Sequence, residues 1–367
     1  MPSIKSKYFE NSKNQFEVIE KQDLLLHYPY HSYEYIVQLL QDAAADRKIS
    51  AIWITLYRVA SDSKIIQSLI QAAKNGKSVF VFVEIKARFD EESNIYWATE
   101  LENAGIKVRY SFPGLKVHSK ICLIERQNKN IAYLSTGNFN EKTAKIYTDL
   151  GYFTSKDTIT KELKRVFGYL AGKKVSTNFK NLLVSPFNLR STFESMINNE
   201  IKHAQAGKRA EIILKLNSLQ DTKMIKKLYA SSQAGVKIKL IVRGICCLIP
   251  GVKNLSENIE AISIVDRYLE HSRIYIFYNG GKKKYYVASA DWMKRNLSRR
   301  IEVGFPIVDD KLIKMIDDVT QLQWQDNKKA RILDEKQSNQ YRKIAGAKTV
   351  QSQNEIYKYL KTFETNN

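Results

Sequence analysis

The stretch His118–Glu125 reads HSKICLIE, and it returns at His271–Phe277 as HSRIYIF. Each copy places a histidine and a cation two residues apart at the start of an apolar run. Because side chains alternate between the two faces of a β-strand, the histidine and the cation of each copy share one face. The copies are 153 residues apart (271 − 118). Four pairs share this spacing: His118 and His271, Lys120 and Arg273, Thr136 and Ser289, and Asn138 and Asp291. The spacing predicts a duplicated chain.

Apolar, β-branched runs alternate with helical patterns in both halves of the chain. Strands are expected at 51–57, 78–85 and 106–110, and again at 211–216, 236–242 and 261–265. Helices are expected at 63–74, 91–104 and 221–232. Asp62 and Ser63 are both favourable N-caps for the first helix, and Gly76 and Gly235 follow helices where a left-handed residue is favoured. The alternation predicts an α/β fold.

A second set of matches extends the duplication. Residues 75–79 align with residues 234–238 at a spacing of 159 (235 − 76), which would place Arg58 opposite Asn217 and Glu84 opposite Arg243. Two halves of about 150 residues fit the usual size of a domain. We expect a linker remnant over 1–23, a first domain over 24–181, a second domain over 182–333 and a weakly apolar C-terminal tail over 334–367.

The composition is strongly basic. The chain has 59 Lys and Arg against 38 Asp and Glu, a formal charge of +21 that attracts polyanions such as nucleic acid, polyphosphate or nucleotides. Cys122, Cys246 and Cys247 have no CxxC spacing, so neither a disulfide framework nor a zinc site is indicated. No run of about 18 apolar residues and no apolar signal core is present. We expect a cytoplasmic protein, with peripheral membrane association left open.

The paired histidines suggest phosphoryl transfer. A single histidine at the start of a strand is usually a satisfied structural residue. If the two halves pack about a pseudo-twofold axis, however, His118 and His271 would approach each other in one cleft between Lys120 and Arg273. One imidazole could then attack phosphorus while the other manages the proton or the charge of the leaving group. No GxxxxGK[ST] loop is present, which disfavours a Walker-type kinase.

The wider sequence resembles two related families. The pattern His-x-Lys-x₄-Glu, followed by STGN at 135–138, resembles the phospholipase D signature, with Glu125 in place of the usual Asp and Arg273 in place of the second Lys. More specific segments resemble the catalytic half of the phosphohistidine-type polyphosphate kinases. They are LHYPYHS at 26–32, TLYR at 55–58, KARFDEE at 86–92, STGNFN at 135–140, IVRGICCL at 241–248 and SADWM at 289–293.

This resemblance implies a fold and a reaction. The fold would be two duplicated phospholipase D-like domains, each a mixed sheet flanked by helices, and the enzyme would transfer the γ-phosphate of ATP reversibly to inorganic polyphosphate. The resemblance runs from about Leu24 to about Arg331 and does not cover the amino-terminal helical domain and head domain of the family. Those missing amino-terminal domains would be partners of this chain, a homo-oligomer is left open, and no specific nucleic acid is expected.

The resemblance also assigns roles to individual residues. His118 would be the phosphorylated histidine, and His271 would be a second catalytic histidine that lies against the nucleotide. Tyr147 and Arg243 would contact ATP, and Arg58 and Arg88 would bind the phosphates that carry Mg²⁺, since guanidinium groups grip phosphate oxygens and not the metal. Lys120, Arg273 and Asn138 complete the expected substrate site.

Two other functions are weighed beside this one. A phospholipase D-like phosphodiesterase acting on lipid or nucleic acid would use the same histidine pair with water or an alcohol as acceptor. A non-catalytic polyanion-binding fragment would explain the charge, but it has no need for two matched imidazoles. Product analysis separates the first alternative from a kinase, and the sequence does not decide the direction of the reversible reaction.

Overall fold

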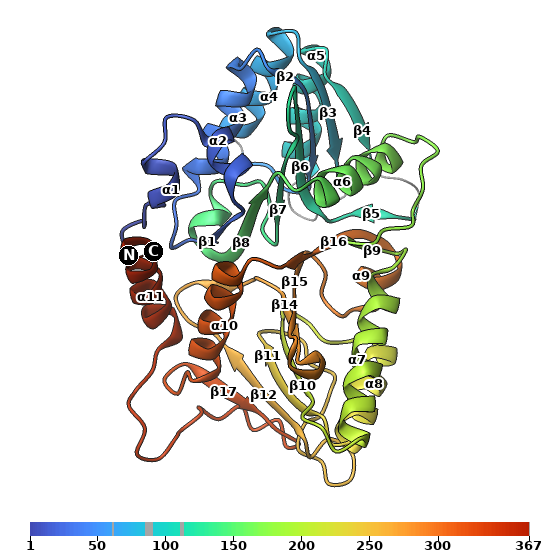
Figure 1. Ribbon diagram of the computed structural model, residues 1–367, viewed down its shortest axis with the longest axis vertical. Helices are drawn as coiled ribbons and strands as arrows, with labels where there is room; N and C mark the ends of the chain where they lie inside the picture. Colours follow the sequence, from blue (N-terminus) through green and yellow to red (C-terminus); the bar gives the residue numbers. More distant parts are fainter. Residues whose placement is uncertain (61, 85–90, 111–113, 367) are drawn as a thin grey trace.

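The computed structural model describes residues 1–60, 62–84, 91–110 and 114–366. Figure 1 shows two lobes stacked along the long axis, each built on one sheet. We call residues 1–181 the first lobe and residues 182–333 the second lobe. Each sheet mixes parallel and antiparallel pairings and is flanked by helices. The predicted α/β fold with two duplicated domains is confirmed.

The first sheet runs in the order β1-β8-β7-β6-β2-β3-β4. Its strands are β1 (Leu24–Tyr28), β2 (Ile49–Leu56), β3 (Ser78–Val83), β4 (Lys107–Tyr110), β6 (Lys120–Arg126), β7 (Ile131–Ser135) and β8 (Tyr147–Thr154). Strands β2, β3 and β4 are parallel, so their carboxyl ends meet at one edge of the sheet. Ligands of α/β proteins bind at such edges.

The second sheet repeats this plan in the order β17-β12-β11-β10-β14-β15-β16-β5. Its strands from the second lobe are β9 (Leu183–Ser185), which pairs with β16 off the main path, β10 (Glu211–Leu216), β11 (Lys237–Val242), β12 (Ile259–Ile264), β14 (Ile274–Phe277), β15 (Lys284–Ala288), β16 (Arg300–Ile307) and β17 (Ala330–Leu333). β17 adds an edge strand for which the described part of the first sheet has no equivalent.

Helices flank both sheets. They are α1 (Lys7–Glu10), α2 (Gln15–Lys21), α3 (Glu34–Ala45), α4 (Lys64–Lys74), α5 (Glu91–Asn103), α6 (Asp157–Leu170), α7 (Leu189–Gln205), α8 (Thr222–Gln233), α9 (Lys294–Ser298), α10 (Asp310–Trp324) and α11 (Ser352–Asn366), with 3₁₀ turns at Thr143–Lys145 and Asn279–Gly281. Of these, α6, α10 and α11 lie between the two lobes. The predicted N-cap is confirmed, because the Ser63 side chain accepts a hydrogen bond from Ile66 N. Gly76 and Gly235 have positive φ angles of 78° and 93°, as predicted for helix ends.

One hydrophobic core is shared by the two lobes. It combines apolar residues of both sheets with the inner faces of α6, α10 and α11. At its centre the rings of Tyr152 and Phe305 stack with centroids 5.2 Å apart. These two residues are related by the spacing of the duplication (305 − 152 = 153), so the stack marks the pseudo-twofold axis.

Each lobe also lends a two-residue strand to the sheet of the other. β5 (Lys116–Val117) pairs with Arg300 and Ile301 of β16, and β13 (Leu269–Glu270) pairs with Tyr147 and Thr148 of β8. The exchanged strands lie 153 residues apart (269 − 116), and so do their partners (300 − 147). The interface between the lobes is therefore itself duplicated.

The pairing registers correct one alignment made from the sequence. Leu56 pairs with Val83 and Leu216 pairs with Val242, while Val83 and Val242 are 159 residues apart. The strand β2 thus matches β10 at a spacing of 160 (216 − 56), and Asn217 is equivalent to Tyr57, not to Arg58. A shift of one residue exchanges the two faces of a strand, so this register decides which side chains enter the site.

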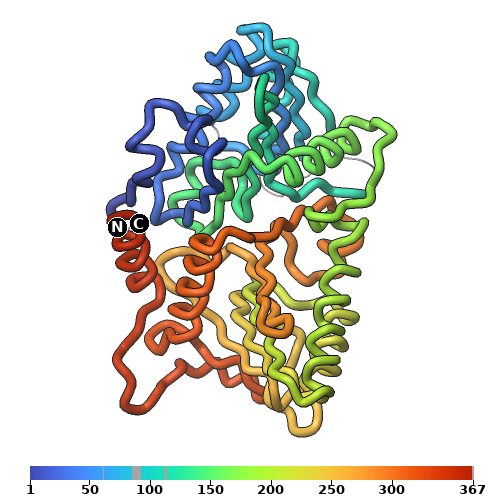
Figure 2. Tube along the Cα trace, viewed as in Figure 1, coloured from blue at the N-terminus to red at the C-terminus, as the bar shows by residue number. Residues whose placement is uncertain are grey.

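The terminal segments pack more closely than a linker and a tail would. Phe9, Phe16 and Ile19, which precede the predicted first domain, are buried in the core of the first lobe. Ile356 and Leu360 of α11 are fully buried in the shared core. Figure 2 shows the red C-terminal helix beside the blue N-terminal segment. Apolar spacing on short helices explains both, because burial of one face stabilises a helix that is weak alone.

No helix among the described residues is long and apolar enough to cross a lipid bilayer.

Candidate active site

His118 lies where β5 leaves the second sheet and β6 enters the first. Its backbone N–H donates to Ile301 O at 2.9 Å, and the Ser119 N–H donates to the same oxygen at 3.0 Å. Both bonds are made to the opposite lobe. The imidazole is mostly buried, with 12% of the side chain exposed.

His271 is held in the same way from the other side. Its backbone N–H donates to Thr148 O of β8 at 3.2 Å, and 13% of its side chain is exposed. Lys120 begins β6 and Arg273 directly precedes β14, and both are buried beside their histidines. The structure thus brings both predicted histidines and both predicted cations to the interface between the lobes, near the carboxyl ends of β2, β3, β10 and β11.

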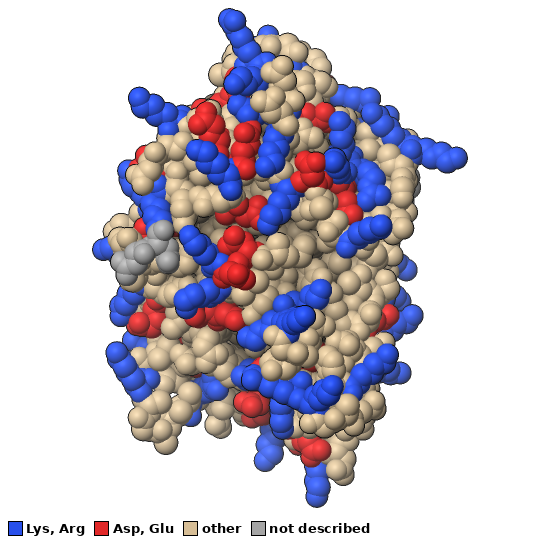
Figure 3. Space-filling model, in the orientation of Figure 1, with Lys and Arg blue, Asp and Glu red and all other residues tan. Residues whose placement is uncertain are grey.

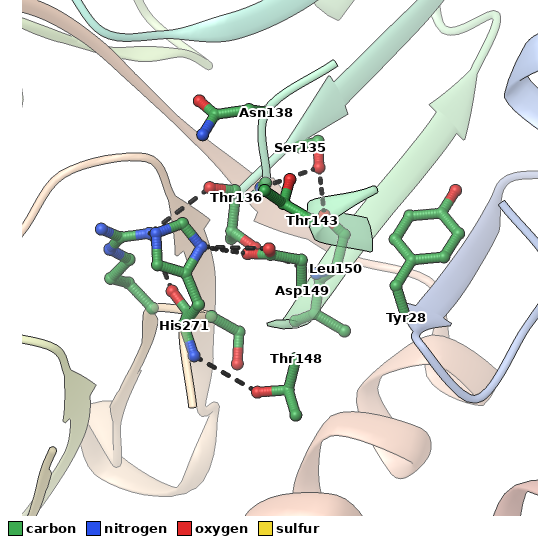
Figure 4. A network of polar contacts seen from close by, with 12 residues as sticks. Tyr28, Ser135, Thr136, Asn138, Thr143, Thr148, Asp149, Leu150 and His271 are labelled. Carbon is green, nitrogen blue, oxygen red and sulfur yellow. Dashed lines mark hydrogen bonds and ion pairs between the residues drawn. The ribbon is translucent and has the colours of Figure 1, made fainter. Parts of the chain in front are cut away.

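Each imidazole binds a carboxylate from the opposite lobe. His118 Nδ1 lies 2.9 Å from Glu302 Oε1, and His271 Nδ1 lies 2.8 Å from Asp149 Oδ1. Figure 4 shows the His271 ring facing Asp149 across the interface. A carboxylate at Nδ1 favours the tautomer that carries its proton there, which leaves Nε2 with a free lone pair. Both imidazoles are therefore oriented as nucleophiles or bases at Nε2.

Hydroxyl groups hold the two carboxylates. Thr136 Oγ1 donates to Asp149 Oδ1 at 2.6 Å, and Ser289 Oγ donates to Glu302 Oε2 at 2.5 Å. Asn296 Nδ2 adds a bond of 2.6 Å to Glu302 Oε1. The matched Thr and Ser of the sequence pattern are thus explained: they orient the partners of the histidines.

The two cations differ in their partners. Arg273 Nη2 forms a buried ion pair with Asp291 at 3.1 Å, and Arg273 Nη1 lies 3.3 Å from His271 Nε2. Lys120 Nζ donates to His118 O and lies 5.1 Å from the centre of the Tyr57 ring. Within the described part of the chain, no carboxylate lies within 4 Å of the Lys120 ammonium. Burial lowers the pKa of Lys120 well below its ordinary value although Glu302 opposes this, whereas for Arg273 the charge of Asp291 outweighs burial and the pKa lies above its ordinary value.

Burial and neighbouring charges shift the pKa values at the His118 site. Burial, followed by the charges of Lys120 and Arg300, lowers the pKa of His118 well below its ordinary value of 6.5. Burial also raises the pKa of Glu302. The low pKa keeps His118 neutral at neutral pH, so its Nε2 lone pair is available.

The pKa shifts at the His271 site have a different pattern. Burial lowers the pKa of His271, although Asp149 opposes this. Burial acts to raise the pKa of Asp149, but His271, Thr136 and Arg273 outweigh it and the pKa lies below its ordinary value. Asp149 is therefore a firmly ionised partner.

The other predicted contact residues surround these pairs. The Tyr147 ring lies 5.2 Å from the His271 ring, between centroids, and Arg243 Nε donates to Glu270 O, the residue before His271. Arg58 follows β2 and is half-buried. Asn138 appears beside this network in Figure 4, and its buried Oδ1 accepts no hydrogen bond from the described residues. Arg88 lies outside the described residues.

Several site residues were not singled out from the sequence. Asp149 and Glu302 are the most important, and their spacing continues the duplication (302 − 149 = 153). Tyr57 contacts His118 with ring centroids 4.8 Å apart, and Arg300 is the equivalent of Tyr147. Extending the spacing to acidic residues would have found the two carboxylates, but not which histidine each binds.

The described residues include no group of three or more His, Cys, Asp or Glu side chains placed to hold a metal ion. The cations around His118 would repel a bare divalent ion. The described side chains therefore do not fit a directly bound Mg²⁺, and any magnesium here would have to be carried by phosphate oxygens.

Comparison with known proteins agrees with this geometry. The model for polyphosphate kinase C-terminal domain 1 matches residues 14–176, and the model for C-terminal domain 2 matches residues 182–353. The polyphosphate kinase of Yersinia pestis is 48% identical over an alignment of 368 positions that covers 99% of this chain and 54% of that protein. That of Escherichia coli strain K12 is 46% identical over 370 aligned positions, with the same coverage of 99% and 54%.

A solved structure shows the same architecture. The crystal structure of polyphosphate kinase from Porphyromonas gingivalis superposes with a TM-score of 0.95 at 43% identity, covering 100% of this chain and 57% of that one. The chain thus spans about half the length of these relatives. With both lobes matched by family models, this chain belongs to the polyphosphate kinase family.

Proposed function

We propose that this chain carries the catalytic site of a polyphosphate kinase that works through a phosphohistidine. The observation that carries the proposal is the crossed pair of imidazoles, each held at Nδ1 by a carboxylate of the opposite lobe. The reaction would transfer the γ-phosphoryl group of ATP reversibly to the end of inorganic polyphosphate. Family membership favours this reaction over a phospholipase D-like phosphodiesterase.

In the first step, His118 Nε2 would attack the γ-phosphorus. The new N–P bond forms as the bond from the γ-phosphorus to the bridging oxygen breaks, and ADP leaves with that electron pair. Positive charge develops on the imidazole, and Glu302 at Nδ1 stabilises it. The raised pKa of Glu302 makes this carboxylate a better base for the Nδ1 proton.

The charges around the two histidines favour His118 as the residue that is phosphorylated. Lys120 forms no ion pair within 4 Å among the described residues, Arg300 lies 3.9 Å from Glu302, and both side chains act on His118 as positive charges. His271 lies instead beside ionised Asp149, and its cation Arg273 is already paired with Asp291. A doubly negative phosphoryl group is more stable in the first setting.

His271 would serve the other end of the reaction. With Asp149 to stabilise its protonated form, the imidazole can neutralise the leaving phosphate oxygen of ADP and later assist the incoming chain. In the second step a terminal polyphosphate oxygen attacks the phosphorus of phosphohistidine. The N–P bond breaks, the electron pair returns to His118, and polyphosphate is longer by one unit.

Substrate binding would use the basic residues around this pair. Arg58 and Arg243 follow strands at the carboxyl edges of the two sheets, Tyr147 lies against His271, and Arg88 is proposed from the sequence alone. Figure 3 shows Lys and Arg side chains spread over the viewed face, which suits attraction of a long polyanion. Mg²⁺, if required, would arrive on the nucleotide phosphates and neutralise part of their charge.

The test is labelling with ATP that carries ³²P at the γ-position. We expect acid-labile, base-stable label on the protein, located at His118, and release of the label into polyphosphate when chain acceptor is added. ATP labelled at the α-position is the matched control and should leave no label. Label on serine, or label from α-labelled ATP, would contradict the phosphohistidine mechanism.

A further inference from the structure

Glu270, the residue before His271, is the centre of a buried polar cluster. Its side chain is 2% exposed, and burial acts to raise its pKa, but Lys215 outweighs this and holds the pKa below its ordinary value. Four groups from four elements bind the carboxylate: Lys215 Nζ of β10 at 2.8 Å, Thr148 Oγ1 of β8 at 2.9 Å, Gln323 Nε2 of α10 at 2.9 Å and Gln353 Nε2 of α11 at 2.8 Å. No other residue of β13 has such a set of bonds.

The first lobe has neutral residues in place of the Lys215–Glu270 pair. The equivalent of Glu270 is Val117 (270 − 153), and the register of β2 against β10 places Thr55 opposite Lys215. His118 is thus presented by neutral residues at the same two positions. Burying two charges costs more than burying apolar groups of similar size, so the Lys215–Glu270 pair is not needed for the fold itself. A role at the His271 side explains why the second lobe has it.

The strand β13 connects this cluster to the nucleotide side of the site. Arg243 Nε donates to the Glu270 carbonyl oxygen at 2.8 Å. Leu269 of β13 pairs with Tyr147, and His271 follows directly. The three residues proposed to contact ATP through this side, Tyr147, Arg243 and His271, therefore all take their positions from β13.

The C-terminal helix α11 holds β13 from behind. Gln353 is 1% exposed, and its Nε2 donates to Tyr268 O at 2.8 Å while its Oε1 accepts from Tyr268 N at 3.0 Å. At its other end α11 reaches the first lobe, where Glu364 binds His31 Nε2 at 3.1 Å and Lys7 N at 2.9 Å. Figure 1 shows α11 at the junction of the two lobes.

We propose that Gln353 and Glu270 are positioning residues that couple the C-terminal helix to the nucleotide side of the active site. Gln353 fixes the Tyr268–Glu270 segment, and Glu270 fixes the orientation of Arg243 and His271. The inference rests on the proposed function for the identity of the ligand, ATP, but not for the coupling itself.

The test compares Gln353→Ala with Gln351→Ala. Gln351 directly precedes α11 and its Nε2 donates to the Asp266 carboxylate at 2.8 Å, so its removal deletes an amide–carboxylate bond outside the Tyr268–Glu270 segment. Two readouts are measured: ATP affinity by calorimetry, and the imidazole signals of the five histidines by NMR with ¹³C-labelled histidine. We expect Gln353→Ala to weaken ATP binding about tenfold and to move the His271 signal, with His118 unchanged. Gln351→Ala should match the wild type.

A second variant keeps the coupling testable if Gln353→Ala does not fold. Gln323→Met removes the bond that α10 makes to Glu270 with little change of side-chain size, and it should move the His271 signal in the same way. If the His271 signal coincides with the wild type in both variants, the coupling is refuted. If wild-type protein binds no ATP, the proposed function fails, and the NMR comparison still decides the coupling because it needs no ligand.

Discussion

The His118 site and the His271 site are built from equivalent positions, yet their imidazoles have different electrostatic surroundings. Each ring binds a carboxylate through Nδ1, and each carboxylate accepts from a hydroxyl group. At the first site Asn138 occupies the position that Asp291 holds at the second. The neutral amide forms no ion pair with Lys120, whereas Asp291 pairs with Arg273. Duplication has preserved the geometry while single substitutions have separated the chemistry.

The difference between the two electrostatic surroundings shows how a symmetric fold can support an asymmetric reaction. A phosphoryl acceptor needs a neutral imidazole, and burial holds the pKa of His118 well below its ordinary value. A proton or charge carrier needs a stable anion behind it, which Asp149 supplies to His271. The following experiments test this division of roles between His118 and His271.

Removal of either imidazole should have the largest effect. We expect His118→Ala to abolish labelling from γ-labelled ATP, because the nucleophile is gone. We expect His271→Ala to retain slow labelling while turnover to polyphosphate falls at least about 10²-fold. Both variants should fold, since each ring lies at an interface and not in the apolar core. Persistent label in His118→Ala would overturn the assignment of roles.

Neutralisation of the two carboxylates should separate their functions. We expect Glu302→Gln to slow the formation of phosphohistidine by about 10³-fold, because no base then stabilises charge on the attacking ring. Asp149→Asn should slow it by about 10²-fold, since its partner assists only the leaving group. Rapid-quench labelling measures both rates, and Lys314→Ala, on the exposed face of α10, is a neutral control. Equal losses of labelling rate would mean that the two carboxylates contribute equally to the formation of phosphohistidine.

Replacement of Lys120 should mainly slow labelling, whereas replacement of Arg273 should mainly lower the stability of the fold. Lys120→Met leaves no described carboxylate unpaired, so we expect about 10²-fold slower labelling with a nearly unchanged melting temperature. Arg273→Met leaves Asp291 buried without its partner and should lower the free energy of unfolding by about 3 kcal/mol. Thermal denaturation beside the labelling assay checks this contrast. A large loss of stability in Lys120→Met would remove the argument for an unpaired cation.

The arginines beyond the histidine pair should contribute moderately. Arg243→Ala and Arg58→Ala should each weaken ATP or polyphosphate binding by about 2 kcal/mol, or roughly 30-fold, and the weakening should depend on salt. Titrations of polyphosphate with each variant give the comparison between the lobes. Curves that overlay the wild type would show these arginines to be ordinary surface charges.

The smallest expected effect is that of mild acid on His118. An imidazole with the ordinary pKa of 6.5 would be half protonated at pH 6.5, and its nucleophilic rate would be halved there. Because the pKa of His118 lies well below 6.5, the ring stays neutral and labelling should fall less than twofold from pH 8 to pH 6.5. A midpoint near 6.5 in the single-turnover rate would show that burial does not protect the nucleophile.

Much of the fold could be predicted because it depends on local patterns. Strand periodicity placed residues 78–85 close to the observed Ser78–Val83, and residues 211–216 match β10. The spacing of 153 predicted the duplication because both copies must present the same faces. The alignment of Arg58 with Asn217 was wrong by one residue, because the turns after β2 and β10 differ in length and only strand pairing fixes the register.

The sequence alone was enough to identify the two histidines, their adjacent cations, the hydroxyl residues and the duplicated α/β fold. Only the tertiary structure decided the partners. Glu302 binds His118 across 184 residues, and Asp149 binds His271 across 122 residues. These contacts exist because β5 and β13 each cross to the opposite sheet. No local periodicity encodes such a crossing, since it depends on how two apolar surfaces pack about an axis. That packing is what gives each imidazole a carboxylate partner from the opposite lobe.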